Sequence, residues 1–274
     1  MKEDRLRDLQ SILLKMLNDI TKICDENGIQ YFLDGGTMLG AVRHHGFIPW
    51  DDDVDIAMRR EDYEKFLNVC KTKLNQELYF LQNEQTEKNY IHAFTKIRLN
   101  GTHIIEEFSK NVDIHNGIFI DVFPYDNVPD GSIRRMFFLT NNYLLKNMLW
   151  AKCGYGEPHQ KQTIRYKICL FLSHLFSVEY IKQKRHKLLS KYNKDKTLEC
   201  FTSDYPKIKH KNSWFDKRKM YQFEEFTFWG VENYDAFLTN LYQNYMILPP
   251  ENQRRSHSSC EIDFGVLENQ LLNR

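Results

Sequence analysis

Apolar residues recur along this chain at helical spacing in some segments and form β-branched or aromatic runs in others. Between Leu6 and Cys24 they fall every three or four positions, which predicts one amphipathic helix that ends near Asn27-Gly28. The remaining pattern mixes both element types, so the predicted fold class is α/β (α+β). Further helices are expected at 62–74, 134–149, 164–176, 179–192 and 234–245, strands at 29–33, 91–99, 118–123 and 220–229, and loops at 159–162 and 207–214.

The most unusual polar segment is an acidic run, Asp51-Asp52-Asp53-Val54-Asp55, which apolar residues flank on both sides. This setting favours a buried or half-buried strand over a solvated acidic turn. Because side chains alternate along a strand, Asp53 and Asp55 would share one side, about 7 Å apart, and could hold a hard cation such as Mg²⁺. An EF-hand is excluded, since Ile56 stands where its loop requires glycine.

Two further segments carry candidate chemistry. The expected strand 29–33 leads into Asp34-Gly35-Gly36-Thr37, where paired glycines would let the backbone approach a ligand and Thr37 would cap a short helix that faces an anion. Downstream, Asp121 interrupts an apolar strand, which is costly unless it is paired or metal-bound. Strand, Gly-Gly, helix and a two-carboxylate strand form the arrangement of polymerase-β-like nucleotidyltransferases. We therefore expect such a core, with a mixed sheet plus additional helices.

Together these motifs resemble the LicD family, which includes bacterial phosphocholine transferases and is related to fukutin and fukutin-related protein. The resemblance is strongest in residues 31–58 and spans most of the chain, from about Leu9 to about His257. Its later parts are Lys96-Ile97-Arg98 with Thr102, residues 118–124, and Leu248-Pro249-Pro250 with Arg254, Arg255 and His257, which would close the site.

The resemblance implies a Mg²⁺-dependent (or Mn²⁺-dependent) phosphotransferase that uses a CDP-alcohol donor, CDP-choline first of all. The acceptor would be a hydroxyl of a glycan or lipid-linked glycan, as in teichoic acid, lipopolysaccharide or capsule precursors, and CMP would leave. The implied catalytic and metal-binding residues are Asp53, Asp55 and Asp121, with Asp51 as a further ligand and Asp121 as the proton acceptor. The implied donor-binding and phosphate-binding residues are Gly35, Gly36, Thr37, Arg43, Lys96 and Arg98.

Several alternatives stay open at this point. Surface charge would also account for Arg43, and an exposed strand face for Lys96 and Arg98. A metal-dependent glycosyltransferase would explain Asp53-Val54-Asp55, but it would explain neither the Gly-Gly helix nor Asp121. Ribitol phosphate or glycerol phosphate could replace phosphocholine as the transferred unit. A catalytically dead, membrane-associated module is the remaining alternative, and the intact acidic set argues against it.

Composition indicates a folded enzyme in a reducing compartment. The chain has 274 residues, of which 42% are apolar and 14% aromatic, which argues against disorder. The six cysteines show no C-x-x-C spacing, so neither a zinc site nor a disulfide framework is expected. The start of the chain does not read as a signal peptide, and no uncharged stretch is long enough to span a bilayer. We expect a cytoplasmic protein, for which peripheral contact with the inner face of the membrane stays open.

The charge distribution divides the chain. The net charge is +1, yet residues 159–219 hold 16 Lys and Arg against 5 Asp and Glu. This basic region could be a solvated face or could meet an anionic acceptor or membrane, and the absence of a nucleic-acid motif argues against nucleic acid. Within it, the apolar segment 164–176 fits either a buried helix or an interfacial one. The expected organisation is a catalytic core at 1–130, a helical basic or acceptor region at 131–219, and a strand and helix that complete the site at 220–274.

Overall fold

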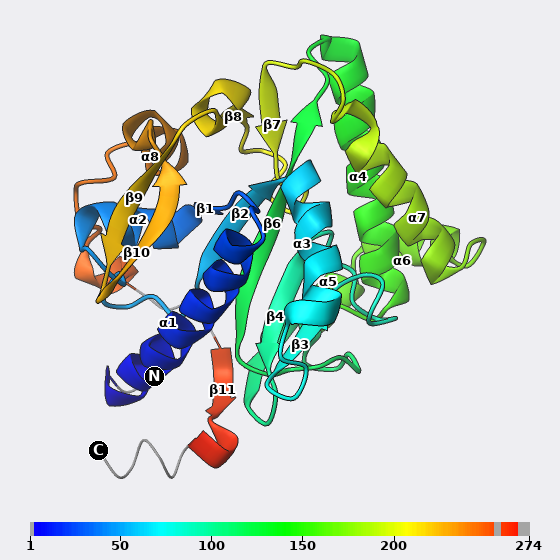
Figure 1. Ribbon diagram of the computed structural model, residues 1–274. Coiled ribbons are helices and arrows are strands. Elements are labelled where there is room, and N and C mark those ends of the chain that lie inside the picture. Colours follow the sequence, from blue (N-terminus) through cyan, green and yellow to red (C-terminus); the bar gives the residue numbers. More distant parts are fainter. Residues whose placement is uncertain (1–2, 255–258, 268–274) are drawn as a thin grey trace.

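A mixed β-sheet forms the centre of the structure, a computed structural model that describes residues 3–254 and 259–267 (Figure 1). Its strand order is β1–β2–β6–β4–β3, in which β2 and β6 are parallel and the other neighbours are antiparallel. This confirms the expected α/β class with a mixed sheet. The strands are β1 (Phe32–Leu33), β2 (Asp55–Arg59), β3 (Tyr79–Gln82), β4 (Thr95–Leu99) and β6 (Phe119–Val128), extended beyond β6 by β7 (Glu199–Phe201) and β8 (His210–Lys211).

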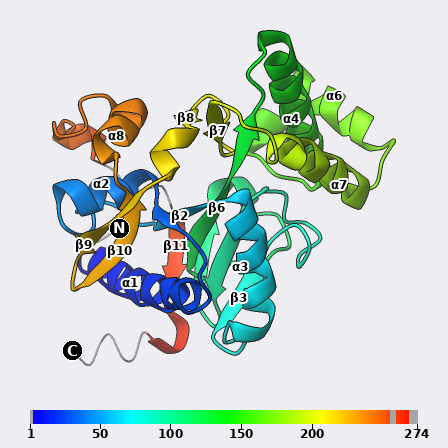
Figure 2. The ribbon, with the colours of Figure 1, turned by 45° about the horizontal axis from the view of Figure 1, so that its top comes forward.

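Helices α1 (Glu3–Glu26) and α3 (Arg60–Lys73) lie side by side over one face of this sheet (Figures 1 and 2). Their inward positions recur at helical spacing, and residues such as Leu13, Leu17 and Phe66 are buried in the main core. The apolar periodicity of the sequence therefore predicted both helices and the faces that they bury.

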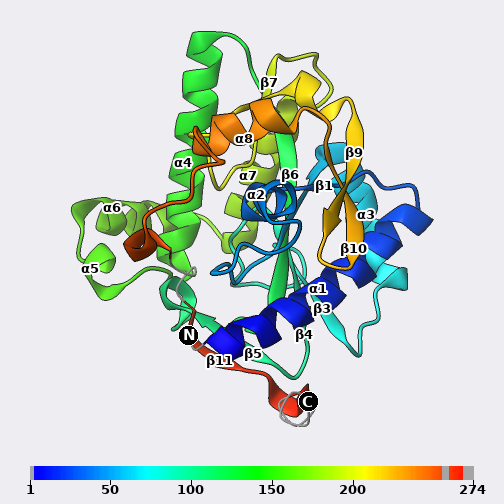
Figure 3. The ribbon, with the colours of Figure 1, turned by 90° about the vertical axis from the view of Figure 1, so that its left-hand side faces the viewer.

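The helix that begins at the glycine pair is covered by elements from the C-terminal region. Helix α2 (Gly35–Arg43) contacts strand β9 (Arg218–Phe223), and α8 (Tyr234–Tyr242) lies over α2 (Figure 3). Strand β9 pairs with β10 (Phe226–Val231) in a hairpin, which corrects the single strand expected at 220–229. The hairpin turns at Glu224, whose φ of 52° is unusual for a residue with a side chain.

Helices α4 to α7 stand together at the side of the sheet, apart from α1, α2 and α8 (Figure 2). They surround a separate small apolar cluster that includes Met148, Leu149 and Ile181. In α6 only Cys169 and Ser173 are buried, so the helix at 164–176 is a surface helix rather than a core one. The bounds are α4 (Ser132–Lys152), α5 (Pro158–Lys161), α6 (Ile164–Ser173) and α7 (Val178–Leu189).

The remaining elements are short. Strand β11 (Ser259–Asp263) returns to pair with β5 (His103–Glu106), so residues 259–263 pack beside a segment from the middle of the sequence. Single 3₁₀ turns connect the larger elements. They are η1 (Glu107–Ser109), η2 (Ser190–Tyr192), η3 (Asn212–Phe215), η4 (Glu251–Gln253) and η5 (Gly265–Leu267).

Where the expected elements were wrong, local contacts explain the difference. Only the last residue of the acidic run is in a strand, because the Asp51 amide turns back to the Ile48 carbonyl and Gln10 Nε2 binds the Asp51 carbonyl at 2.9 Å. Residues 91–94 precede β4 without joining it, and 159–161 belong to helix α5 rather than a loop. Residues 207–214, expected as loop, contain β8 and part of η3.

Candidate active site

Two carboxylates that are far apart in the sequence, Asp55 and Asp121, meet across neighbouring strands. In the parallel pair β2–β6, Asp55 lies directly beside Asp121, and the Asp121 amide donates to the Val54 carbonyl at 2.9 Å. On the other side of β6, Lys96 of β4 occupies the position beside Asp121. Three strands thus bring together a row of Asp55, Asp121 and Lys96, in which Asp121 is 66 positions from Asp55 and 25 from Lys96 in the sequence. The sequence predicted the two carboxylates on neighbouring strands, and the structure brings them together.

The loop before β2 gathers the other carboxylates. Asp51, Asp52 and Asp53 each offer one oxygen, and these oxygens lie within 4.8 Å of one another. Asp51 and Asp52 are buried and Asp53 is half-buried. Among the described residues this is the group whose side chains already have the spacing of metal ligands. Asp55, one residue beyond it, interacts electrostatically with both Asp51 and Asp53.

The start of α2 is capped by Asp34, not by Thr37 as expected. The Asp34 carboxylate accepts hydrogen bonds from the Gly35 amide and from the Tyr125 hydroxyl, both at 2.8 Å. Thr37 lies inside the helix, where its hydroxyl accepts from the Asp55 amide at 2.9 Å and so fixes the beginning of β2. Aspartate is among the most favoured N-cap residues, so its place before the glycines was a signal that sequence reasoning missed.

Both glycines are required by the acidic group around them. A Cβ on Gly35 would lie 3.0 Å from Asp55 Oδ2, and one on Gly36 would lie 2.8 Å from Asp51 Oδ2. Gly35 also has a φ of 50°, which side chains disfavour. The absence of side chains therefore lets two carboxylates approach the positive end of helix α2 closely.

The site strongly disfavours additional negative charge. The pKa of Asp55 is raised well above its usual range by burial first and then by Asp53, Asp121, Asp34 and Asp51. Burial likewise raises the pKa of Asp34 to about 6, although hydrogen bonds from Tyr125 and Gly35 oppose the rise. Clustered carboxylates of this kind are stabilised by a cation bound among them.

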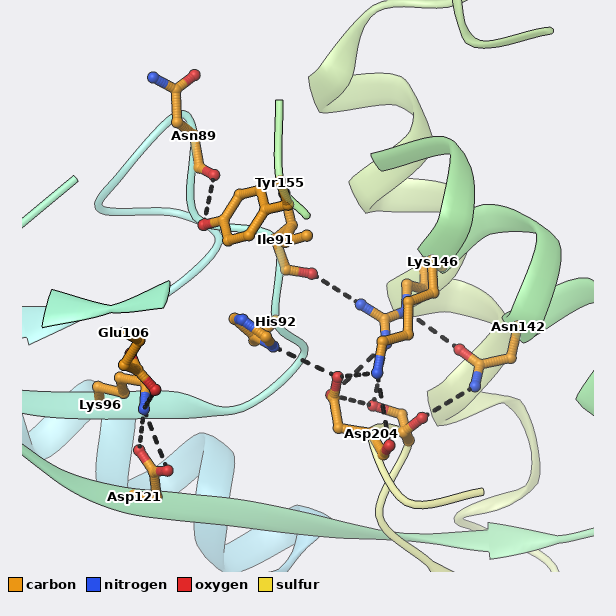
Figure 4. Close-up of polar contacts among 12 residues, drawn as sticks. Asn89, Ile91, His92, Lys96, Glu106, Asp121, Asn142, Lys146, Tyr155 and Asp204 are labelled. Atoms are coloured by element: carbon orange, nitrogen blue, oxygen red, sulfur yellow. Dashed lines mark hydrogen bonds and ion pairs between the residues drawn. The ribbon is translucent and has the colours of Figure 1, made fainter. Parts of the chain in front are cut away.

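Asp121 has a pKa suited to proton transfer near neutral pH. Burial raises it, the Lys96 ammonium lowers it and Glu106 raises it again, and the result is about 7. The Lys96 Nζ lies 3.0 Å from Asp121 Oδ1 and 3.5 Å from Glu106 Oε1 (Figure 4). A group that gains or loses its proton close to the working pH makes an effective general base.

Lys96 and Arg98 are buried side by side rather than displayed on an exposed strand face. They are 2% and 0% exposed, and both contact Glu106. The Arg98 guanidinium also donates to Gln82 Oε1 and to the Gly117 carbonyl, and it does not line the pocket described below. The exposed-face alternative is therefore wrong, and the contacts of Arg98 stabilise the strands that carry Lys96 and Asp121.

A pocket of about 770 Å³ opens in front of the acidic group and the start of α2. Asp34, Gly35 and Gly36 line it, together with the carboxylates of Asp51, Asp53 and Asp55, and Asp121 lies directly beside Asp55 on the neighbouring strand. The other walls are largely aromatic and apolar. They include Trp50, Phe123, Tyr125, Tyr205, His210, Tyr242, Tyr245, Ile247 and Leu248.

Basic residues hold the rim of this pocket. Arg43, which lines it, donates to the Tyr245 carbonyl at 2.6 Å, and burial lowers the pKa of its guanidinium. Arg254 donates to the Pro249 carbonyl at 2.9 Å and lies 5.4 Å from the centre of the Trp50 ring. The sequence expectation that the C-terminal region reaches the site agrees with this contact. Its other two residues, Arg255 and His257, lie outside the described part of the chain.

The donor atoms of the site fit a hard divalent cation. Every candidate ligand is a carboxylate oxygen, and three of them already lie close enough to share one ion. Mg²⁺ and Mn²⁺ prefer such oxygen ligands, whereas zinc sites draw on histidine and cysteine. The raised pKa of Asp55 is the second observation in favour of a cation, because a bound positive charge would offset the repulsion from the neighbouring carboxylates that adds to the effect of burial.

Comparison with known proteins identifies one family model and several proteins that this chain resembles. A family model described as LicD/FKTN/FKRP, nucleotidyltransferase domain, matches residues 28–148. The chain is 30% identical to the lipopolysaccharide cholinephosphotransferase LicD of Haemophilus influenzae over 268 residues, which cover 94% of this chain and 97% of that protein. It is also 44% identical to human ribitol 5-phosphate transferase FKRP over 43 residues. That stretch covers 16% of this chain and 9% of that protein. The matched domain contains the glycine pair, the acidic run and Asp121.

Proposed function

The chain belongs to the LicD family, and from this premise we propose that it transfers phosphocholine from CDP-choline to a glycan hydroxyl and releases CMP. The observation that carries the proposal is a single pocket that brings together the Gly35-Gly36 helix start and the acidic group of β2. A nucleoside diphosphate needs both features, one to bind phosphate oxygens and one to hold the cation that neutralises them.

The acidic residues have separate roles in this proposal. Asp53 and Asp55 would hold Mg²⁺ or Mn²⁺, with Asp51 beside them, because these carboxylates share one wall of the pocket. The bound ion would neutralise the diphosphate and polarise the phosphorus that is attacked. Mutual repulsion among the carboxylates would weaken as the ion binds, so cation and donor should bind cooperatively.

The chain's other residues position the donor. The α2 N-terminus, exposed to the pocket at Gly35 and Gly36, would accept donor phosphate oxygens, and Arg43 would contact them from the rim. Thr37 contributes indirectly, since its hydroxyl fixes the backbone of Asp55. Lys96 likewise acts through Asp121, which it holds by an ion pair.

Asp121 would accept the proton of the attacking hydroxyl. The new bond joins the acceptor oxygen to the phosphorus of phosphocholine, and the bond from that phosphorus to the CMP oxygen breaks. The electron pair leaves with CMP, and the acceptor proton passes to Asp121, whose pKa of about 7 suits this step. Lys96 keeps part of the Asp121 population ionised in spite of burial.

The aromatic walls favour choline over a polyol. A trimethylammonium group has no hydrogen-bond donors and binds well against aromatic faces. Tyr205, Tyr242, Phe123 and Trp50 all line the pocket and supply such rings. Ribitol or glycerol would need several hydrogen-bond partners in the same place. The similarity to FKRP keeps ribitol phosphate as the second candidate.

We propose lipopolysaccharide as the acceptor class, as in the name of the Haemophilus relative, and a lipid-linked precursor of it as the form that is modified. Such an acceptor would place the enzyme beside a membrane. Teichoic acid and capsule precursors carry the same kind of sugar hydroxyl and are the other acceptors to be compared.

A donor panel tests the proposal. Purified protein is incubated with Mg²⁺, lipopolysaccharide lacking phosphocholine, and CDP-choline, CDP-ribitol, CDP-glycerol or a nucleotide sugar, and CMP release is measured. CDP-choline should give the highest kcat/KM, and EDTA should abolish turnover. A preference for CDP-ribitol would change the donor, whereas turnover only with the nucleotide sugar would replace the proposal by a glycosyltransferase.

A further inference from the structure

Helices α4 and α6 each present an apolar stripe to solvent. On α4 the stripe contains Ile133, Met136 and Phe137. It is interrupted by Thr140 and resumes one turn later at Tyr143 and Leu144. Ile133 is 70% exposed and Phe137 is 60% exposed. The spacing of three and four residues places these side chains on one side of the helix.

The same pattern occurs on α6. Ile164, Ile168 and Phe171 follow one another at intervals of four and three, and Leu175 lies another four residues on. They are between 54% and 77% exposed. The opposite side of α6 packs inward through Cys169. Both helices are therefore apolar on the face that packs and on a second face that meets solvent, where polar residues would normally stand.

The two stripes belong to one surface. Helices α4 and α6 pack against each other along the side of the molecule, as the different views show (Figures 1 and 3). Arg165 of α6 donates to the Tyr143 hydroxyl of α4 at 2.6 Å, and its guanidinium lies 5.8 Å from the centre of that ring. We call this surface, with Ile133, Met136, Phe137, Tyr143, Leu144, Ile164, Ile168, Phe171 and Leu175, the α4–α6 face.

Positive charge accompanies the apolar side chains. Residues 131–178, which include both helices, contain seven Lys and Arg and one acidic residue, Glu157. Arg134, Arg165 and Lys167 are exposed on the same two helices as the stripes. An apolar surface with aromatic side chains and surrounding cations matches the interface of a bilayer that carries anionic headgroups.

We propose that the α4–α6 face binds peripherally to a membrane surface rich in anionic lipid. The described residues include no helix that is long and apolar enough to cross a membrane, so binding would be interfacial. This inference goes beyond the transfer reaction, since it requires neither the donor nor the catalytic carboxylates. A second copy of the chain fits less well, because a symmetric contact would oppose two positively charged faces.

The α4–α6 face only partly overlaps the basic region 159–219 that stands out in the sequence. In α7, Lys182 and Arg185 are buried, where Lys182 Nζ binds the carbonyls of Glu84, Glu87 and Lys88 and Arg185 binds the Ile91 carbonyl. These two cations hold α7 to the core and are not available to lipid. The membrane contact moves accordingly to α4 and α6.

Co-sedimentation with vesicles tests the proposal on the full-length protein. The wild type should sediment with phosphatidylglycerol–phosphatidylcholine vesicles at low salt and less with pure phosphatidylcholine. Replacing Ile168 and Phe171 together by serine should weaken binding by at least roughly tenfold, because two apolar side chains no longer enter the interface. Met136→Ser with Phe137→Ser tests the other stripe independently. Leu198→Ser, a similarly exposed leucine outside the α4–α6 face, should bind as wild type.

Further measurements separate the possible failures. Circular dichroism shows whether each variant is folded, and CMP release from CDP-choline should continue in the serine variants if the soluble site is intact. Failure of the wild type to sediment with anionic vesicles at low salt overturns the proposal. So does a wild-type dimer in light scattering that the Phe171 variant converts to a monomer, since the face would then join two chains. Vesicle binding without any CMP release would overturn the proposed reaction alone.

Discussion

The buried carboxylate of Asp204 connects helices α4 and α7 to the segment that contains His92. It lies 2.6 Å from the Lys146 ammonium of α4, 3.6 Å from the Arg185 guanidinium of α7 and 3.4 Å from His92 Nδ1 (Figure 4). Burial alone would raise its pKa, but Lys146 and Arg185 outweigh burial and hold the pKa well below its usual range. The charged form is therefore strongly favoured in the folded protein.

Replacing Asp204 by asparagine keeps the shape of the side chain and removes its charge. Loss of one partner of a buried ion pair typically costs about 3–5 kcal/mol. Because the Lys146 side chain is 25% exposed and can regain water, we expect the low end, about 3 kcal/mol of unfolding free energy. Asp195→Asn, nine positions earlier in the sequence, removes an exposed carboxylate and should change stability by less than about 0.5 kcal/mol.

The pH dependence of the unfolding free energy tests whether the missing charge causes the loss of stability. A carboxylate with a lowered folded-state pKa adds stability that is complete above its unfolded pKa of about 3.9 and is lost as the pH falls toward the folded value. The difference between wild type and Asp204→Asn, from urea unfolding followed by circular dichroism, should stay constant down to about pH 5 and shrink below about pH 4. An asparagine variant within about 0.5 kcal/mol of wild type at neutral pH would refute the reasoning.

Three further predictions concern the pocket. Asp55→Asn should lower CMP release by at least ~10² without lowering Tm, because it removes both a metal ligand and a repelled charge; activity that survives would remove the metal role from Asp55. Asp121→Asn should lower kcat by at least ~10² with a smaller change in donor affinity, and a change in Tm alone would make Asp121 structural. Gly36→Ala should raise KM for CDP-choline roughly tenfold or more, because its Cβ would meet Asp51 at 2.8 Å. Gly131→Ala, which has room for a Cβ, is its control, and equal KM values in the two variants would contradict the close-approach argument.

The elements that a single periodicity describes could be predicted from the sequence. Helices α1 and α3 have one strong apolar stripe toward the core, and the structure places each within a few residues of its expected range. Short strands such as β3 and β7 have only three or four residues and are defined by their neighbours in the sheet. Their pairing partners are far away in sequence, so local pattern could not reveal them.

Within the site, residue types were easier to predict than their partners. The acidic run and the glycine pair meet in one pocket, as their order along the chain suggested. The cap formed by Asp34 escaped notice because Thr37, three residues later, is also a capping residue by type. The ion pair between Lys96 and Asp121 depends on the register of β4 against β6, which no local pattern encodes.

The most direct test of the central claim is identification of the transferred group. Purified protein, CDP-choline, Mg²⁺ and lipopolysaccharide lacking phosphocholine are incubated together, and the glycan is analysed by mass spectrometry while CMP is measured in the same sample. The account predicts one phosphocholine added for each CMP released, in wild type and not in Asp55→Asn. CMP release without phosphocholine on the glycan, or equal transfer by the Asp55 variant, would contradict it.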